Sequence, residues 1–114
     1  GNRPVKRMGK NAQIIRMDGH GVPEILDAIL RVFPLDTYIE KPVNLMEVMP
    51  GDNVQTPIWD VYKKTVEKYD ERGKNAIGEI ERFKFYEETK TAYAVIATSE
   101  KALYANIMLQ KGVV

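Results

Sequence analysis

Short apolar runs alternate along this chain with longer segments in which apolar residues recur at helical spacing. The short runs are typical of strands, and the spacing i, i+3, i+4 is typical of amphipathic helices. This alternation indicates an α/β layered domain with a mostly parallel central sheet flanked by helices. We expect a single domain over residues 1–114. Strands are predicted at residues 13–17, 43–49, 93–98 and 105–109, the third buried on both faces.

Proline and glycine mark the expected ends of two long helices. The first is predicted to begin after Gly21, because Pro23 fits a first helical turn, and to end at Pro34. The second is predicted to begin with Thr56 as its N-cap and to end at Gly73, which suits a left-handed C-terminal cap. Its apolar stripe is interpreted as core and not as a cofactor site, and consists of Ile58, Trp59, Tyr62, Val66 and Tyr69.

Charge and composition exclude several classes of function. Seventeen basic and sixteen acidic side chains give a net charge of +1, which argues against nucleic acid or an anionic membrane as the main partner. The basic run at residues 3–10 is interpreted as a solvated loop in preference to a phosphate site. The chain has no cysteine, and no apolar run approaches the ~20 residues of a membrane helix. We expect a cytoplasmic protein that uses neither metal nor cofactor.

Two polar pairs near the C-terminus are the strongest candidates for a binding site. Arg82 and Tyr86 are four residues apart, so they share a face if the predicted helix at residues 83–91 includes Arg82. Tyr104 and Asn106 are two apart, so they point to one side of a strand. A charged fork, phenols and an amide are groups that hold a sugar by several hydroxyls. The alternative is that the tyrosines are half-buried aromatics and that Arg82 pairs with a neighbouring glutamate, Glu81 or Glu87.

Four segments together resemble the L-fucose mutarotase family, whose relatives are the D-ribose pyranases. These segments are Leu35-Asp36-Thr37-Tyr38, Asn44-Leu45-Met46-Glu47, Glu81-Arg82-Phe83-Lys84-Phe85-Tyr86-Glu87 and Leu103-Tyr104-Ala105-Asn106. The resemblance implies a fold of the ribose-pyranase/fucose-mutarotase type and interconversion of the α and β anomers of free L-fucose. It also implies that Asp36 and Tyr86 are catalytic. The sugar-binding residues that it implies are Met46, Arg82, Tyr86, Tyr104, Ala105 and Asn106.

The exact sugar and the role of the protein leave alternatives open. Ala105 is often glycine in the fucose enzymes, and Tyr-Ala-Asn also occurs in ribose pyranases, whereas Arg82 and the segment around Asp36 favour fucose. A D-ribose pyranase-like isomerase and a non-catalytic sugar-binding or assembly protein are therefore the alternatives. A nucleotide-binding module is disfavoured, because the glycines around His20 fit no phosphate-loop spacing.

The resemblance also carries expectations about the N-terminal segment and about assembly. Family members carry an extra N-terminal helix and strand with a catalytic histidine in Gly-His-Gly-Asp, and we expect this chain to lack that segment. His20 is not assigned that role, because it follows the segment at residues 16–19 that matches a different part of the family pattern. The resemblance implies a homo-oligomer, with a decamer first and a dimer second. Residues 107–109 give weaker support, because they would form an aggregation-prone edge unless the chain's own sheet or another subunit covers them.

Overall fold

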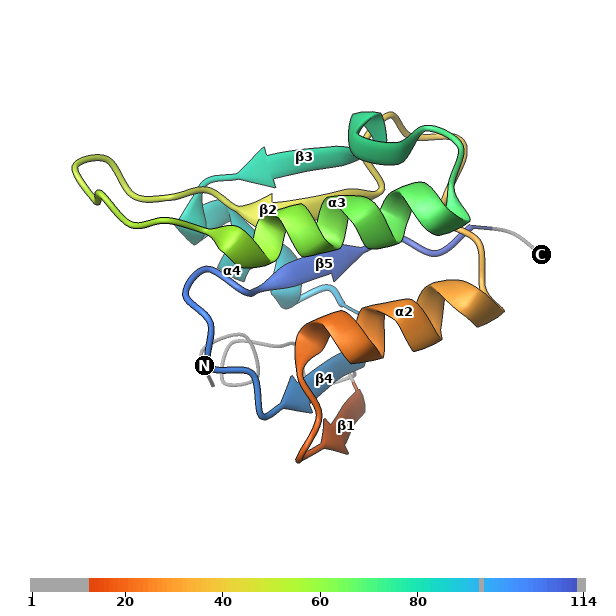
Figure 1. Ribbon diagram of the computed structural model, residues 1–114, viewed down its shortest axis with the longest axis horizontal. Coiled ribbons are helices and arrows are strands. Elements are labelled where there is room, and N and C mark those ends of the chain that lie inside the picture. Colours follow the sequence, from red (N-terminus) through yellow and green to blue (C-terminus); the bar gives the residue numbers. More distant parts are fainter. Residues whose placement is uncertain (1–12, 93, 113–114) are drawn as a thin grey trace.

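The computed structural model describes residues 13–92 and 94–112, and the basic run at residues 3–10 lies outside them. Strands and helices alternate along most of the described chain (Figure 1), which confirms the predicted α/β class. Within this part of the chain, no helix is long and apolar enough to cross a membrane. In chain order, the elements are β1 (Gln13–Met17), α2 (Val22–Val32), β2 (Val43–Met46), α3 (Pro57–Tyr69), η1 (Gly73–Ala76), β3 (Ile77–Ile80), α4 (Arg82–Thr89), β4 (Ala94–Thr98) and β5 (Ile107–Leu109).

The described strands form two separate sheets, where one central sheet was expected. β1 and β4 pair in parallel, and the order of the larger sheet is β3-β2-β5. In the larger sheet β2 runs parallel to β3 and antiparallel to β5, so the predicted parallel arrangement holds only in part. Figure 1 shows the consequence, with the β2 and β3 arrows pointing one way and the β5 arrow pointing the other.

The central strand β2 has two different faces. Val43 and Leu45 pack into a core with α2 and α3, whereas Met46 packs with Phe85 and Tyr86 of α4 on the opposite face. This division follows the two-residue period of a strand. The neighbouring strands keep it: Ile77, Ile107 and Leu109 belong to the first core, and Ile80 and Met108 to the second. The face that carries Met46 is therefore separate from the main core.

The long helices begin where the sequence predicts. Gly21 and Thr56 occupy the N-cap positions of α2 and α3, each with proline in the first turn, although the Thr56 side chain makes no capping hydrogen bond. The α2 helix ends at Val32, two residues before Pro34. The α3 helix ends at Tyr69, four residues before Gly73. Gly73 does have the predicted left-handed backbone, with φ of 55°, but it begins η1 instead of capping α3.

Several strand predictions need correction. The strand predicted at residues 43–49 ends at Met46, because the chain turns at Met49, whose carbonyl accepts from the amide of Asp52. The strand predicted at residues 105–109 begins only at Ile107. The interior strand predicted at 93–98 is β4, and its residues Ala94, Ile96 and Thr98 stay partly exposed because β4 pairs with β1 alone among the described strands. The sequence prediction missed β3 entirely.

Candidate functional site

The carboxyl ends of the parallel strands β2 and β3 meet at one edge of the larger sheet. Met46 ends β2 opposite Ile80, which ends β3, and the amide of Glu47 donates to the Ile80 carbonyl at 2.8 Å. β5 begins at this edge because it runs the other way: Leu45 pairs with Ile107, so Asn106, the residue before β5, lies at the end of the sheet where β2 ends in Met46. Polar ligands of α/β proteins commonly bind outside the carboxyl ends of the strands.

The α4 helix brings Arg82 and Tyr86 to the same edge. The helix begins at Arg82, two residues after β3, and Glu81 caps it by accepting hydrogen bonds from the amides of Phe83 and Lys84 at 2.9 and 3.1 Å. Tyr86 is 5% exposed and packs with Met46. Arg82 and Tyr86 are thus four residues apart on one helix, as predicted, and share a face beside Met46.

Arg82 has a buried hydrogen-bond donor that the described residues do not satisfy. Its Nε atom is buried and has no hydrogen-bond partner among the described residues. Neither of the glutamate pairs considered as an alternative forms in this part of the chain, because Glu81 caps the helix and Glu87 pairs with Lys90 at 3.0 Å. The guanidinium carbon lies 4.8 Å from the ring centre of Phe83. A buried guanidinium donor without a partner is costly, and a ligand oxygen would satisfy it.

Tyr104 lies in a strained turn before β5. Its φ of 54° makes it the one non-glycine residue with positive φ in the described chain. Because this backbone is not extended, the two-residue spacing of Tyr104 and Asn106 does not put them on one side of a strand, and that prediction is wrong. The Tyr104 hydroxyl donates to Asp52 Oδ2 at 2.7 Å and accepts from the amide of Met49 at 3.3 Å. It therefore contacts the loop that follows β2.

Two donors from α3 hold the carbonyl groups of this turn. The indole Nε1 of Trp59 donates to the Tyr104 carbonyl at 2.8 Å, and the hydroxyl of Tyr62 donates to the Ala105 carbonyl at 2.6 Å. Burial, with a smaller contribution from Glu100, raises the pKa of Tyr62, so its phenol remains a donor well above neutral pH. Ala105 packs against the α2–α3 core, which leaves its backbone as the part that could meet a ligand.

Asp36 lies at the opposite edge of the sheet. Its amide donates to the Gln110 carbonyl at 2.8 Å, beyond the carboxyl end of β5, whereas Asn106 precedes the amino end. At ~3.3 Å per extended residue, the four steps along the chain from Asn106 to Gln110 span roughly 13 Å. Within one chain, Asp36 is therefore separated from Met46 and Asn106. The structure packs Met46 with Tyr86 and places Arg82 on the same helix. Asn106 and the Tyr104 turn precede β5 at the same end of the sheet.

Arg72 holds the turn that contains Asp36. Its guanidinium donates to the carbonyls of Asp36 and Ile39 at 3.1 and 3.2 Å. Asp70 orients that guanidinium by accepting from its Nε and Nη2 atoms at 3.0 and 2.8 Å. These hydrogen bonds lower the pKa of Asp70, with desolvation opposing them. The side chain of Asp36 itself accepts from the amide of Tyr38 at 2.8 Å, as in an Asx turn.

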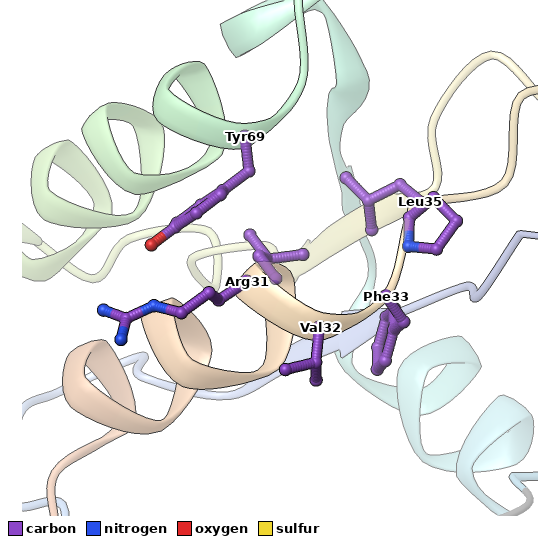
Figure 2. Close-up of a pocket in the computed structure, with 7 residues that line it drawn as sticks. Arg31, Val32, Phe33, Leu35 and Tyr69 are labelled. Atoms are coloured by element: carbon purple, nitrogen blue, oxygen red, sulfur yellow. The ribbon is translucent and has the colours of Figure 1, made fainter.

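A pocket of about 300 Å³ lies near the Asp36 edge and away from Met46. Figure 2 shows Tyr69 reaching from α3 toward Arg31 at the end of α2, with Val32, Phe33 and Leu35 completing the lining. Both polar side chains are engaged by Asp27, which accepts from the Tyr69 hydroxyl at 2.9 Å and from Arg31 at 3.0 Å. The polar groups of this pocket serve helix packing, and it is a poor match for a sugar.

His20 lies apart from the candidate site. It follows β1, its imidazole is about half exposed, and its Nδ1 lies 2.7 Å from Glu24 Oε1. The nearby loop is held by Ser99, whose Oγ accepts from the Gly19 amide at 2.6 Å. No group of three or more histidine, cysteine, aspartate or glutamate side chains that could hold a metal ion occurs in residues 13–92 and 94–112.

The fold is that of an α/β domain, and this edge is a candidate ligand site with cationic, aromatic and amide side chains. The sequence matches the RbsD / FucU transport protein family over residues 1–114, and the chain belongs to this family. It is 47% identical to human fucose mutarotase over 102 residues, which cover 87% of this chain and 65% of that protein. The chain thus spans slightly less than two thirds of the length of that relative.

Two solved structures are similar to this one over nearly the whole chain. FucU from Bifidobacterium longum superposes with a TM-score of 0.94 at 63% identity, covering 100% of this chain and 80% of that one. The fucose mutarotase of Streptococcus pneumoniae, solved in complex with L-fucose, superposes with a TM-score of 0.83 at 43% identity. In that comparison 90% of this chain and 71% of the other are covered.

Proposed function

We propose that this protein is an L-fucose mutarotase, an isomerase that interconverts the α and β anomers of the free sugar. The observation that carries the proposal is that Met46 packs with Tyr86 at one sheet edge, while the buried Nε of Arg82, on the same helix as Tyr86, has no hydrogen-bond partner among the described residues. The similarity to human fucose mutarotase and to a mutarotase solved with L-fucose supports it.

The proposed reaction opens the pyranose ring and closes it on the other face of the aldehyde. One group takes the proton of the anomeric hydroxyl while another protonates the ring oxygen, and the two roles reverse when the ring closes. Atoms and charge balance without a redox partner, so proton donors and acceptors suffice for the chemistry. In this proposal Tyr86 takes part in proton transfer, and its position four residues from Arg82 on one helix and its packing beside Met46 support that role.

The remaining residues bind and orient the sugar in this proposal. Arg82 donates from its buried Nε to a sugar oxygen, and Asn106 and Tyr104 hold hydroxyl groups. Met46 supplies an apolar surface for the C–H groups of the ring. The backbone of Ala105, held by Tyr62, completes the segment.

Asp36 belongs to this catalytic set only if a second copy of the chain supplies it. Its place at the far edge of the sheet excludes it from the cluster of its own chain. We therefore propose a homo-oligomer, with a decamer as the first expectation and a dimer as the second, in which the Asp36 turn of one subunit approaches the cluster of another. Light scattering at micromolar concentration tests this assembly, and a monomer mass would contradict it.

Saturation-transfer NMR of L-fucose tests the activity directly. The full-length protein should accelerate exchange between the α and β anomer signals, and the Arg82→Ala variant should lose most of that acceleration. Binding without faster exchange would instead support a non-catalytic sugar-binding protein. Faster interconversion of D-ribose ring forms with no effect on L-fucose would support the pyranase alternative.

We also propose a cytoplasmic location, in keeping with the absence of cysteine.

A further inference from the structure

We infer that Asp52 is a positioning residue that makes the Tyr104 hydroxyl a hydrogen-bond acceptor toward the sugar. The inference rests on the proposed function, because it concerns how Tyr104 meets that ligand. Asp52 lies in the loop between β2 and α3, and its Oδ2 atom is 2.7 Å from the Tyr104 hydroxyl oxygen. The resemblance to known mutarotases assigns no role to this aspartate.

The hydrogen bonds around Tyr104 determine what its hydroxyl can offer. A phenol has one proton, and an ionised carboxylate can only accept, so the proton of Tyr104 is committed to Asp52. The amide of Met49 donates to the same phenol oxygen at 3.3 Å. This hydrogen bond occupies one of the two lone pairs of the phenol oxygen. The remaining lone pair is the position open to a ligand. A sugar group that meets Tyr104 must therefore donate.

The backbone of this segment is fixed independently of Asp52. Trp59 and Tyr62 hold the carbonyls of Tyr104 and Ala105 at 2.8 and 2.6 Å, and the backbone of Tyr104 has φ of 54°. Because these contacts come from α3, loss of the Asp52 side chain should leave the turn in place. Asp52 is exposed, so its removal should also leave the fold intact. What changes is the direction of the hydroxyl proton.

Monofluorinated sugars separate donation from acceptance. Replacing a hydroxyl by fluorine removes a donor while keeping a similar size, so the four analogues with fluorine at C1, C2, C3 or C4 of L-fucose test each hydroxyl in turn. Calorimetry of the full-length protein should show, for the analogue that lacks the hydroxyl facing Tyr104, binding roughly 5- to 10-fold weaker than that of L-fucose, the range expected for one hydrogen bond. That penalty should disappear in Tyr104→Phe.

Two substitutions of Asp52 then test the positioning role. Asp52→Asn keeps an oxygen that can accept the Tyr104 proton, so it should retain the penalty and bind L-fucose within about 3-fold of wild type. Asp52→Ala frees the proton, so it should bind L-fucose several-fold more weakly and lose most of the penalty. Asp60→Asn removes an exposed acid on the neighbouring helix and serves as the control for charge, with no expected effect.

The possible results distinguish failure of the Asp52 role from failure of the mutarotase proposal. A wild-type protein that binds all four analogues equally, a penalty that persists in Tyr104→Phe, or equal behaviour of Asp52→Asn and Asp52→Ala would overturn the role of Asp52 and leave the mutarotase proposal standing. A wild-type protein that does not bind L-fucose at all would overturn both. Melting temperatures of the variants, measured by circular dichroism, should match wild type within a few degrees.

Discussion

The indole N–H of Trp59 donates to the carbonyl oxygen of Tyr104 at 2.8 Å, and this bond ties α3 to the turn before β5. Three residues further along α3, the Tyr62 hydroxyl holds the next carbonyl, that of Ala105. Positions three apart lie on one helix face, so two aromatic side chains that pack in or against the core also present donors to the candidate site. Packing and ligand positioning are therefore combined in the same pair of residues.

Tyr62→Phe should uncouple these two roles. The substitution keeps the ring in the core and removes only the hydroxyl, which leaves the partly buried Ala105 carbonyl without that donor. We expect a stability loss of about 1–2 kcal/mol together with a clear rise in the Kd for L-fucose. Urea unfolding measures the stability, and calorimetry measures the Kd. The matched control is Tyr69→Phe, which removes another hydroxyl of α3, one that donates to Asp27 of α2. Equal L-fucose affinity in wild type and Tyr62→Phe would contradict the positioning role.

Arg82→Ala should weaken L-fucose binding by roughly ten- to a hundred-fold, because hydrogen bonds to charged groups contribute about 1.5–3 kcal/mol. The fold should persist or gain slightly in stability, since the substitution removes a buried donor that has no partner in the described part of the chain. Lys84→Ala, an exposed cation on the same helix, controls for lost charge. If both variants bind L-fucose like wild type, Arg82 is not part of the site.

His20→Ala should leave anomer exchange within about 3-fold of wild type. The imidazole is about half exposed and contacts Glu24, and neither residue belongs to the cluster around Met46. Saturation-transfer NMR of the full-length variant provides the measurement. A loss of ~10²-fold, the usual scale for removing an acid–base group, would show that this histidine is catalytic after all.

Asp70→Asn should destabilise the protein in a pH-dependent way. The hydrogen bonds from Arg72 lower the pKa of Asp70 in the folded state, so the folded protein releases this proton more readily than the unfolded chain. The stabilisation is therefore fully present above the unfolded pKa of about 3.9 and is lost as the pH falls through the lower folded value. We expect a loss of about 1 kcal/mol at pH 7. Urea titrations at pH 7 and pH 3 should show the gap between wild type and variant closing at the acidic pH.

Gly78→Ala should destabilise the larger sheet. A Cβ atom at this position would lie 2.8 Å from Asn44 Oδ1, which is closer than real Cβ contacts, and 3.2 Å from Lys41 Cγ, which is a tight contact. Overpacking of this kind costs about 1–3 kcal/mol. Asn44→Ala should relieve part of the clash, so the double variant should lose less stability than the sum of the two single variants. Strict additivity in urea unfolding would show that Asn44 is not the obstacle.

Local signals in the sequence were sufficient for the helices and insufficient for the sheets. Proline in the first turn and helical spacing act within a few residues, and they correctly predicted the starts of α2 and α3. The β3 strand was missed because Ile77-Gly78-Glu79-Ile80 is short and contains a glycine, and its pairing with β2 supplies what its own composition lacks. The direction of β5 depends on the loop before it, which carries no such local signal.

The candidate site was predictable in its members and less so in its arrangement. Arg82 and Tyr86 were recognisable because helical spacing fixes their relation. The separation of Asp36 from Met46 could not be predicted, because it depends on which end of β5 each residue meets. Asp52 was missed because an aspartate in a Pro-Gly-Asp-Asn turn is explained by turn chemistry alone. Trp59 and Tyr62 were recognised as core residues, and only the structure shows where their polar atoms point.

The antiparallel pairing of β2 with β5 also determines when the site can form during folding. Leu45 and Ile107 are 62 positions apart along the chain, whereas β2, α3, β3 and α4 follow one another directly. Closing so long a loop costs entropy before the contacts of β5 can offset it, so pairings of this kind tend to form late. Before β5 pairs with β2, the folding chain would already hold Met46 and Tyr86 together, with Arg82 on the same helix, yet Asn106 and the Tyr104 turn would not be in place. Affinity for the sugar would therefore appear only after β5 has paired with β2, when the fold is complete.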